Sequence, residues 1–226
     1  MKGPKRSSGE RSNAWSESKY TNLTRFDPFD SEIPWWRFRG TPEVVVPVKG
    51  SSGVSIYVRR LHPAFLRPCS PSEVAEVLAS IPPAFLAGVE SVHLLGGSLK
   101  QVRAASSKLF HYGCYSAGRI CLHAFPRVLL NQRFRSLPKP HVMHEHLRAG
   151  AVYAKEGARY MLRFSELSLN RFYLYDVLLH EVGHHVERGL QRRGRRGAEG
   201  YARWFAVERA KHLLAGSSAV GCITTG

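Results

Sequence analysis

Residues 174–184 read LYDVLLHEVGH, an apolar run followed by two histidines that stand four residues apart. The run LYDVLL is typical of a helix, so the histidines fall inside a helix rather than a loop. Residues four apart lie one above the other on a helix, so His180 and His184 can bind one cation through their imidazoles. Glu181 is placed to take a proton from a metal-bound water rather than to bind the metal. The segment therefore predicts a zinc site with an adjacent general base.

A third ligand is expected on the next helix, which the pattern AEGYARWFAVERAKHLL predicts from about Ala198 to Leu214. Four residues form a stripe along this helix at helical spacing: Ala202, Ala206, Ala210 and Leu213. Glu199 heads the stripe, and a carboxylate that faces the interior is costly unless a cation meets it. Zinc on the two histidines would supply that cation, which favours Glu199 as the ligand. Glu208 and His212 are the competing ligands.

The fold class follows from the order of the expected elements. Short β-branched runs predict strands, and a Ser-Pro-x-Glu start predicts a helix with a capping box. The expected strands are 44–48, 54–58, 89–95, a hairpin over 109–125 and 151–164, and the expected helices are 70–81, 170–190 and 198–214. Residues 141–150, with three histidines, are expected to form a solvated loop, with a part in substrate binding as the alternative. We expect an α+β fold in which a small mixed or antiparallel sheet packs on the helix of the zinc site, beside the helix that carries Glu199.

Composition bounds the kind of protein. The 226 residues are 43% hydrophobic and 11% aromatic, which excludes a wholly disordered chain. The formal charge of +16 favours acidic partners. No apolar stretch is long enough for a membrane span, and the start MKGPKRSSGERSNAW lacks the apolar core of a signal peptide, so we expect a cytoplasmic protein.

Two parts of the chain differ in composition. Residues 1–40 predict a flexible basic tail or covering segment, and residues 41–226 predict one domain. Within the tail, PWWRFR at 34–39 suits stacking on nucleic acid bases, although aromatics that cover the domain body are the commoner arrangement.

The cysteines do not indicate a disulfide scaffold. Cys69, Cys114, Cys121 and Cys222 show no C-x-x-C spacing and are expected to be reduced thiols. Cys114 and Cys121 can lie opposite each other across the predicted hairpin, and the alternative is that both are small core residues.

The two motifs together resemble a known family. HEVGH at 180–184, followed after fourteen residues by EGYARWFA at 199–206, resembles the gluzincins, the thermolysin-like zinc metallopeptidases. The second motif looks closest to the aminopeptidase version, and the compact layout is similar to the minimal gluzincins, including small bacterial and phage regulatory peptidases. The match covers about the last fifty residues and says little about those before them.

The resemblance implies a zincin-like metallopeptidase domain that hydrolyses peptide bonds, with His180, His184 and Glu199 as zinc ligands and Glu181 as general base. Where the family has an acidic residue four positions after the ligand glutamate, this chain has Arg203, which cannot accept a hydrogen bond from a ligating histidine. Asp176, one turn before His180, can orient that histidine instead; the alternative is a charge at a helix N-terminus.

Further parts of the mechanism also follow mainly from the resemblance. The strand before the zinc helix is expected to bind the substrate backbone by edge pairing. A donor to the oxyanion is also required, and the candidates are Tyr201, Tyr175, His185 and His212.

Between the motifs, ERGLQRRGRRG at 187–197 holds five arginines in eleven residues. It is expected to be a flexible loop, either simply solvated or steering acidic protein or peptide substrates to the site. The rival interpretation is a basic nucleic-acid-binding or regulatory protein with a non-catalytic zinc site. It explains the arginines but gives Glu181 no function. Structural zinc sites also normally use four protein ligands.

Overall fold

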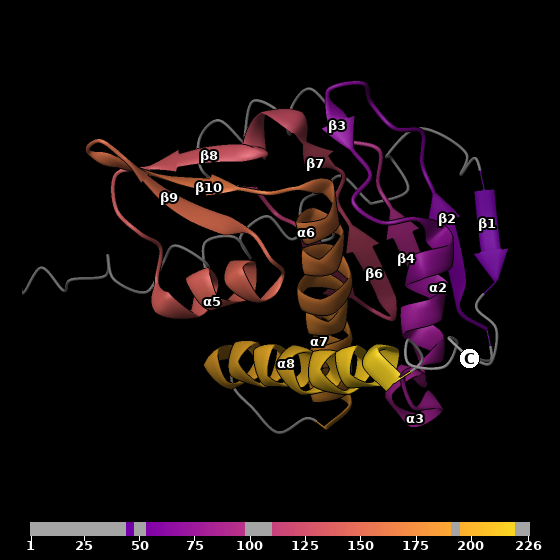
Figure 1. Ribbon diagram of the computed structural model, residues 1–226. Coiled ribbons are helices and arrows are strands. Elements are labelled where there is room, and N and C mark those ends of the chain that lie inside the picture. Colours follow the sequence, from indigo (N-terminus) through magenta and orange to yellow (C-terminus); the bar gives the residue numbers. More distant parts are fainter. Residues whose placement is uncertain (1–43, 48–52, 98–109, 191–194, 220–226) are drawn as a thin grey trace, which may run out of the picture. The chain divides into compact units, whose positions relative to one another are not determined.

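The computed structural model describes residues 44–47, 53–97, 110–190 and 195–219 (Figure 1). The predicted tail 1–40, with its PWWRFR run, and Cys222 lie outside the described residues, so the division of the chain at residue 40 stays a prediction.

The main sheet is mixed and has five strands in the order β1-β2-β4-β6-β5. The three central strands run parallel, and each outer strand is antiparallel to its neighbour. In sheet order the strands are β1 (Val44–Pro47), β2 (Ser55–Val58), β4 (Ser91–Leu94), β6 (Arg119–Leu122) and β5 (Gly113–Ser116). The edge strand β5 is joined to β6 by a tight turn at Ala117 and Gly118, both with positive φ, as a two-residue hairpin requires.

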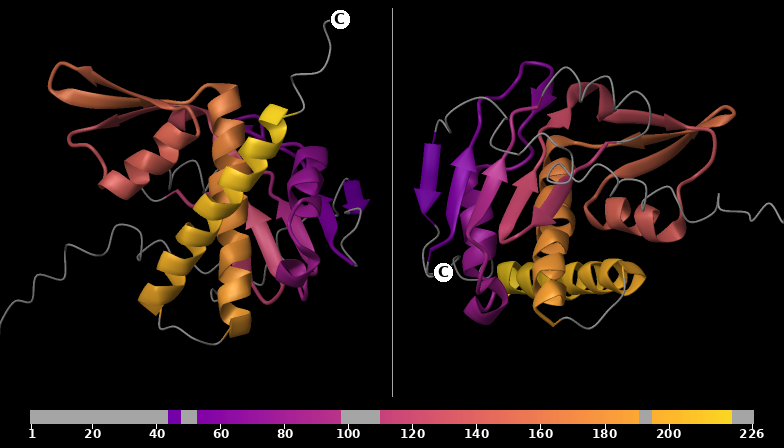
Figure 2. Two further views of the ribbon diagram at one scale, coloured as in Figure 1. Left: turned by 60° about the horizontal axis from the view of Figure 1, so that its bottom comes forward. Right: turned by 180° about the vertical axis from the view of Figure 1, so that it is seen from behind.

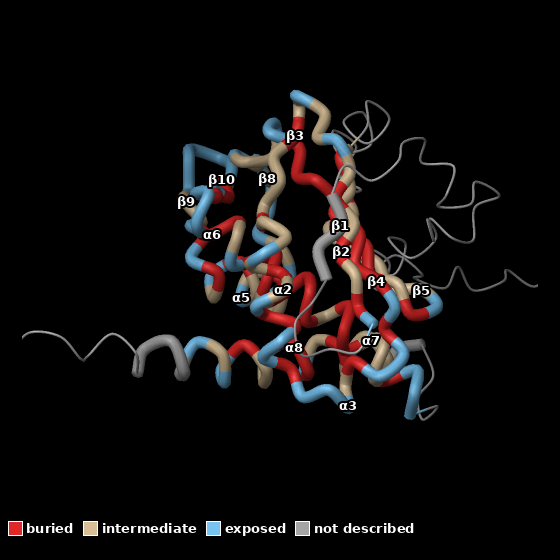
Figure 3. Tube along the Cα trace, turned by 90° about the vertical axis from the view of Figure 1, so that its right-hand side faces the viewer, coloured by how far each residue is buried: buried red, intermediate tan, exposed pale blue. Residues whose placement is uncertain are grey.

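One face of this sheet forms the core. Two rows of apolar side chains cross the parallel strands in register and are buried: Ile56, Val92 and Ile120, then Val58, Leu94 and Leu122. Strand β2 contacts helix α2 (Pro71–Ala79), which has the predicted Ser70–Glu73 capping box and Pro71 at its first position. Figure 3 shows the buried residues concentrated in these strands and the helices packed on them. Each such side chain contributes about 1.5–3 kcal/mol on burial.

The remaining strands form two smaller antiparallel sheets. One has the order β8-β10-β9, and the other pairs β3 with β7. These strands are β8 (Asn131–Phe134), β9 (Val152–Glu156), β10 (Arg159–Arg163), β3 (Phe65–Leu66) and β7 (Phe125–Pro126), with a short 3-10 turn η3 at Arg127–Leu129.

The expected solvated loop at 141–150 is wrong, because most of it is helix α5 (Pro140–Arg148). Pro140 occupies the first helical position, where a missing N–H costs nothing. Val142 and His146, four residues apart, are both buried. Among the three histidines, His146 is thus a core residue, in contact with the rings of Phe164 and Phe172.

A long helical segment runs from residue 166 to residue 190. Helix α6 (Glu166–Arg171) begins at the Ser165 cap, continues as the π-helical segment η4 (Phe172–Leu178) and then as α7 (Leu179–Leu190). Helix α8 (Arg195–Ala219) crosses α7, as Figure 2 shows from two sides, and the short helix α3 (Pro83–Leu86) also contacts α7. Within the described ranges, no helix has both the length and the apolar character needed to cross a membrane.

The predicted α+β class is confirmed: a mixed sheet packs on the helix that carries HEVGH, and a second helix carries Glu199. The arginine-rich segment 187–197 is less of a loop than expected, because α7 extends to Leu190 and α8 begins at Arg195. The hairpin is confirmed as well, with Cys114 directly opposite Cys121 and neither cysteine in a disulfide.

The burial of His146 predicts how stability depends on pH. Burial lowers the pKa of His146 to about 4, and its Nδ1 forms a 2.6 Å hydrogen bond with Tyr153. An unfolded histidine titrates near 6.5, so between about pH 6.5 and pH 4 the unfolded chain binds the additional proton and stability falls as pH falls. Between these two pH values, we expect the free energy of unfolding to fall by about 3 kcal/mol less in His146→Gln than in the wild type. Urea unfolding across this pH range measures it.

His144→Gln is the matched control, because His144 is exposed on the same helix. It should retain the full decline of the wild type. An equal decline in the His146→Gln and wild-type proteins would contradict the assignment of His146 as a buried neutral group.

Candidate metal centre

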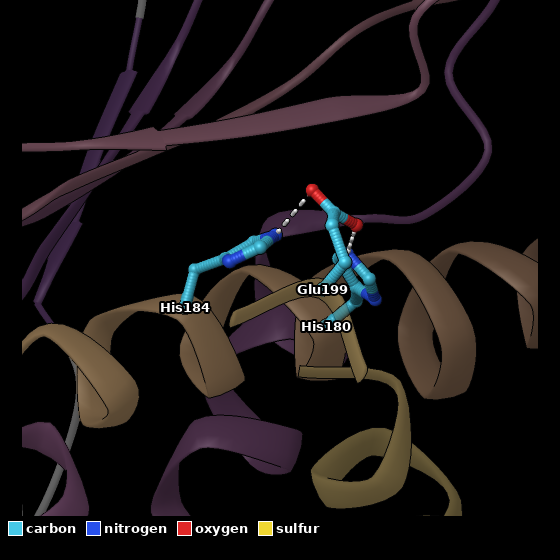
Figure 4. Close-up of side chains that lie close together, drawn as sticks. All are labelled: His180, His184 and Glu199. Carbon is cyan, nitrogen blue, oxygen red and sulfur yellow. Dashed lines mark ion pairs between the residues drawn. The ribbon is translucent and has the colours of Figure 1, made fainter. Parts of the chain in front are cut away.

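The structure brings His180, His184 and Glu199 together. One ligand atom from each lies within 4.8 Å of the others (Figure 4). The Nε2 atom of His180 is 3.5 Å from one carboxylate oxygen of Glu199, and Nε2 of His184 is 3.6 Å from the other. The two imidazole rings are 4.6 Å apart and nearly perpendicular. Two imidazoles and a carboxylate are a donor set that suits zinc with one open position, so these residues form a candidate metal site.

Glu199 reaches the histidines because α8 lies unusually close to α7. A Cβ atom added to Gly183 would lie 2.7 Å from the Cα of Ala202 and 2.9 Å from its carbonyl oxygen. Ala202 is fully buried, as are Ala206 and Ala210 further along the predicted stripe. Only small residues on both helices permit this approach, and Glu199 lies one turn before Ala202 on the same side of α8.

The protonation of the three residues is linked. Glu199 has a lowered pKa, first because of its hydrogen bond with His180, although burial opposes the shift. Burial also disfavours the charged form of His180, but the hydrogen bond to Glu199 and the charge of Glu181 outweigh it and raise the pKa of His180. The pKa of His184 is lowered to about 4, mainly by burial and then by the charge of His180. A metal ion would compete with the proton of His180, so acid should weaken its binding.

Glu181 is buried beside this group but is not one of its members. Its side chain points at the start of β5, where a Cβ on Gly113 would lie 3.0 Å from Oε1. Burial, more than the charge of Glu199, raises the pKa of Glu181 to about 7, and His180 opposes the shift. A carboxyl group with such a pKa can accept and release a proton near neutral pH.

The strand expected at 151–164 to bind substrate is a pair of strands, β9 and β10. Strand β10, which directly precedes the helical segment, lies between β8 and β9 with both edges paired, so it cannot pair with a substrate. The strand whose glycine contacts Glu181 is β5, the last strand of the main sheet. Within the described ranges, no strand pairs with the outer edge of β5. Sequence alone showed the hairpin but not its place at the sheet edge beside α7.

The role expected for Asp176 is also wrong. One of its oxygens pairs with Arg148 of α5, and the other, Oδ2, is buried and has no hydrogen-bond partner among the described residues, so Asp176 does not accept a hydrogen bond from His180. Arg203 does not point to a histidine either; its Nε donates to Glu145 of α5 over 3.0 Å. Helix α5, which the sequence did not predict, is therefore joined by ion pairs to η4, which leads into α7, and to α8.

His185 uses both of its ring nitrogens in hydrogen bonds within the protein. Its Nε2 donates to the carbonyl oxygen of Ala87 over 2.9 Å, and its Nδ1 accepts from the hydroxyl of Tyr115 over 2.8 Å. Both ring nitrogens are thus occupied, which removes His185 from the candidate oxyanion donors. Tyr115, which no sequence pattern distinguishes from other tyrosines, connects β5 with α7.

The competing ligands lie elsewhere. Glu208 pairs with Lys211 over 2.7 Å, and His212 shares a hollow of about 200 Å³ with it. The hollow is lined by Phe85, Tyr201, Trp204, Phe205, Glu208, Arg209 and His212. Neither Glu208 nor His212 belongs to the metal-binding group of the described residues. Of the candidate oxyanion donors, Tyr201 lines this hollow and Tyr175 packs against the core.

Removing the carboxylate of Glu199 tests the ligand set. We expect Glu199→Gln to weaken zinc binding more than about 100-fold, because a neutral amide is a poor ligand. Glu208→Gln, the same change on the same helix, should bind like the wild type. Competition with a fluorescent chelator measures both, and equal affinities of the two variants would contradict the assignment.

The helix crossing can be tested separately. Gly183→Ala should force α8 away from α7, reduce the free energy of unfolding by about 1–3 kcal/mol and weaken zinc binding. Gly189→Ala adds the same methyl group to α7 where nothing lies within 4 Å, so it should keep the wild-type affinity. Calorimetric titration with zinc compares them, and a Gly183→Ala protein of unchanged affinity would show that the close approach does not position Glu199.

Comparison with known proteins identifies no relative: no family model matches the chain, and neither a curated protein nor a solved structure matches it. What the site can do therefore has to be inferred from its own geometry.

Proposed function

We propose that the protein is a zinc-dependent metallopeptidase. The observation that carries this proposal is the combination of a two-histidine, one-carboxylate group with a buried glutamate, Glu181, next to it. His180, His184 and Glu199 would hold the ion. When bound in such an open site, zinc lowers the pKa of a coordinated water to about 7 and polarises the carbonyl that is attacked.

Glu181 moves the proton in this proposal. Its carboxylate accepts a proton from the attacking water and then transfers it to the leaving amine. Its burial suits it to this task, since a carboxylate with little solvation is a stronger base than one in water. Its burial between α7 and β5 keeps the carboxylate in place.

Strand β5 supports a peptide as the substrate. An extended chain can add to the outer edge of a sheet through main-chain hydrogen bonds, and β5 is an edge strand. Because Gly113 has no side chain, the edge strand lies directly against Glu181. A peptide bond held on β5 would therefore lie close to the proposed base.

The rival function, a basic nucleic-acid-binding or regulatory protein with a structural zinc site, is less well supported. A structural site normally has four protein ligands, and the group among the described residues has three, none of them a cysteine. The rival also gives no reason for a buried carboxylate with a raised pKa beside the metal group. The charge of +16 is equally compatible with acidic protein or peptide substrates.

The replacement Glu181→Gln separates catalysis from binding. We expect this variant to bind one zinc per chain like the wild type and to lose at least about 1000-fold in kcat/KM on a peptide substrate, because the base is gone. Zinc content by atomic emission and cleavage of a denatured protein mixture by mass spectrometry give the two readouts. Glu208→Gln serves as the control.

Two results would overturn the proposal. One is zinc binding without cleavage of any peptide by the wild type, which would favour a binding role. The other is cleavage that survives Glu181→Gln, which would mean that another group activates the water.

A further inference from the structure

Arg188 connects the candidate metal site with the edge strand. It lies one turn after His184 on α7 and is exposed. Its guanidinium carbon is 5.7 Å from the centroid of the Tyr115 ring on β5, within the range of a cation–π contact.

The ring beneath Arg188 is held in a fixed orientation. The hydroxyl of Tyr115 donates to His185 over 2.8 Å and accepts from the backbone N–H of Gly118 over 3.1 Å. His185 is itself held by the carbonyl of Ala87. A guanidinium that stacks on a fixed ring keeps its N–H groups at the edge, where they can bind a carboxylate with two parallel hydrogen bonds.

Several arginines of the described residues have an acidic partner, and Arg188 does not. Four arginines form ion pairs with an acidic residue: Arg119, Arg148, Arg163 and Arg203, with Glu90, Asp176, Glu156 and Glu145. Within the part of the chain that the structure describes, no aspartate or glutamate pairs with Arg188. A positive charge beside the site thus points to an acidic group on the bound molecule.

We propose that Arg188 selects substrates with an aspartate or glutamate on one side of the cleaved bond. This inference rests on the proposed peptidase function. Gly113 lies beside Glu181, and Tyr115 is two residues further along the same face of β5, about 7 Å away in an extended strand. A peptide paired with β5 therefore places beside Arg188 a side chain about two residues from the cleaved bond.

A charge reversal tests this assignment. Peptides that differ only in having Asp, Asn or Lys at each position near the cleaved bond are compared by kcat/KM. The wild type should prefer Asp over Asn by about tenfold at one position, about two residues from the bond. Arg188→Glu should prefer Lys at that same position, and Arg188→Gln should lose the preference without reversing it. Arg159→Glu, an equal change at an exposed arginine of β10, should keep the wild-type preference.

The outcomes separate the two proposals. If the wild type cleaves peptides and loses this activity in Glu181→Gln, but shows no preference for Asp or keeps it in Arg188→Glu, the role of Arg188 is wrong and the peptidase function stands. If no peptide is cleaved, the peptidase function fails, and the role of Arg188 fails with it. Zinc content and thermal midpoints of the Arg188 variants, expected to match the wild type, show that their fold and metal group are intact.

Discussion

The close approach of α7 and α8 at Gly183 and Ala202 is the constraint on which the candidate site depends. Two imidazoles on one helix provide only part of a metal site, and the carboxylate has to come from another element. The missing side chain of Gly183 lets the backbone of α8 come close enough for Glu199 to lie 3.5 and 3.6 Å from the histidines. The stripe of buried alanines keeps this crossing close along α8, while the sheet packs on the other side and places Gly113 against Glu181. The geometry of the candidate site thus depends on small residues that are not members of the metal group.

Features that depend on local spacing could be predicted from the sequence. The interval of four between His180 and His184 places both on one helix face, and the position of Glu199 at the head of an alanine stripe predicts that it faces the same partner. The capping box at Ser70 and the hairpin with Cys114 opposite Cys121 are local patterns of the same kind, and the structure has both. The roles of the site residues in binding a metal and in catalysis stay predictions.

Features that depend on partners distant in the chain could not be predicted. Asp176 has the right helical position to meet His180, but Arg148 of α5 takes one of its oxygens, and α5 itself was expected to be a loop. Strand β10 is adjacent to the helical segment in sequence, yet β8 and β9 pair with both of its edges. In each case local propensity is compatible with several arrangements, and tertiary packing selects one.

X-ray absorption spectroscopy at the zinc edge, on protein loaded with one zinc per chain, tests the candidate metal site directly. Coordination by His180, His184 and Glu199 predicts a shell of nitrogen and oxygen ligands at about 2.0–2.2 Å, with the multiple scattering of two imidazoles and no sulfur. In Glu199→Gln protein at the same zinc concentration the multiple scattering of the imidazoles should weaken, because less of the zinc is bound to the histidines. Sulfur scattering at about 2.3 Å, or the same spectrum for both proteins, would contradict a metal site made of His180, His184 and Glu199.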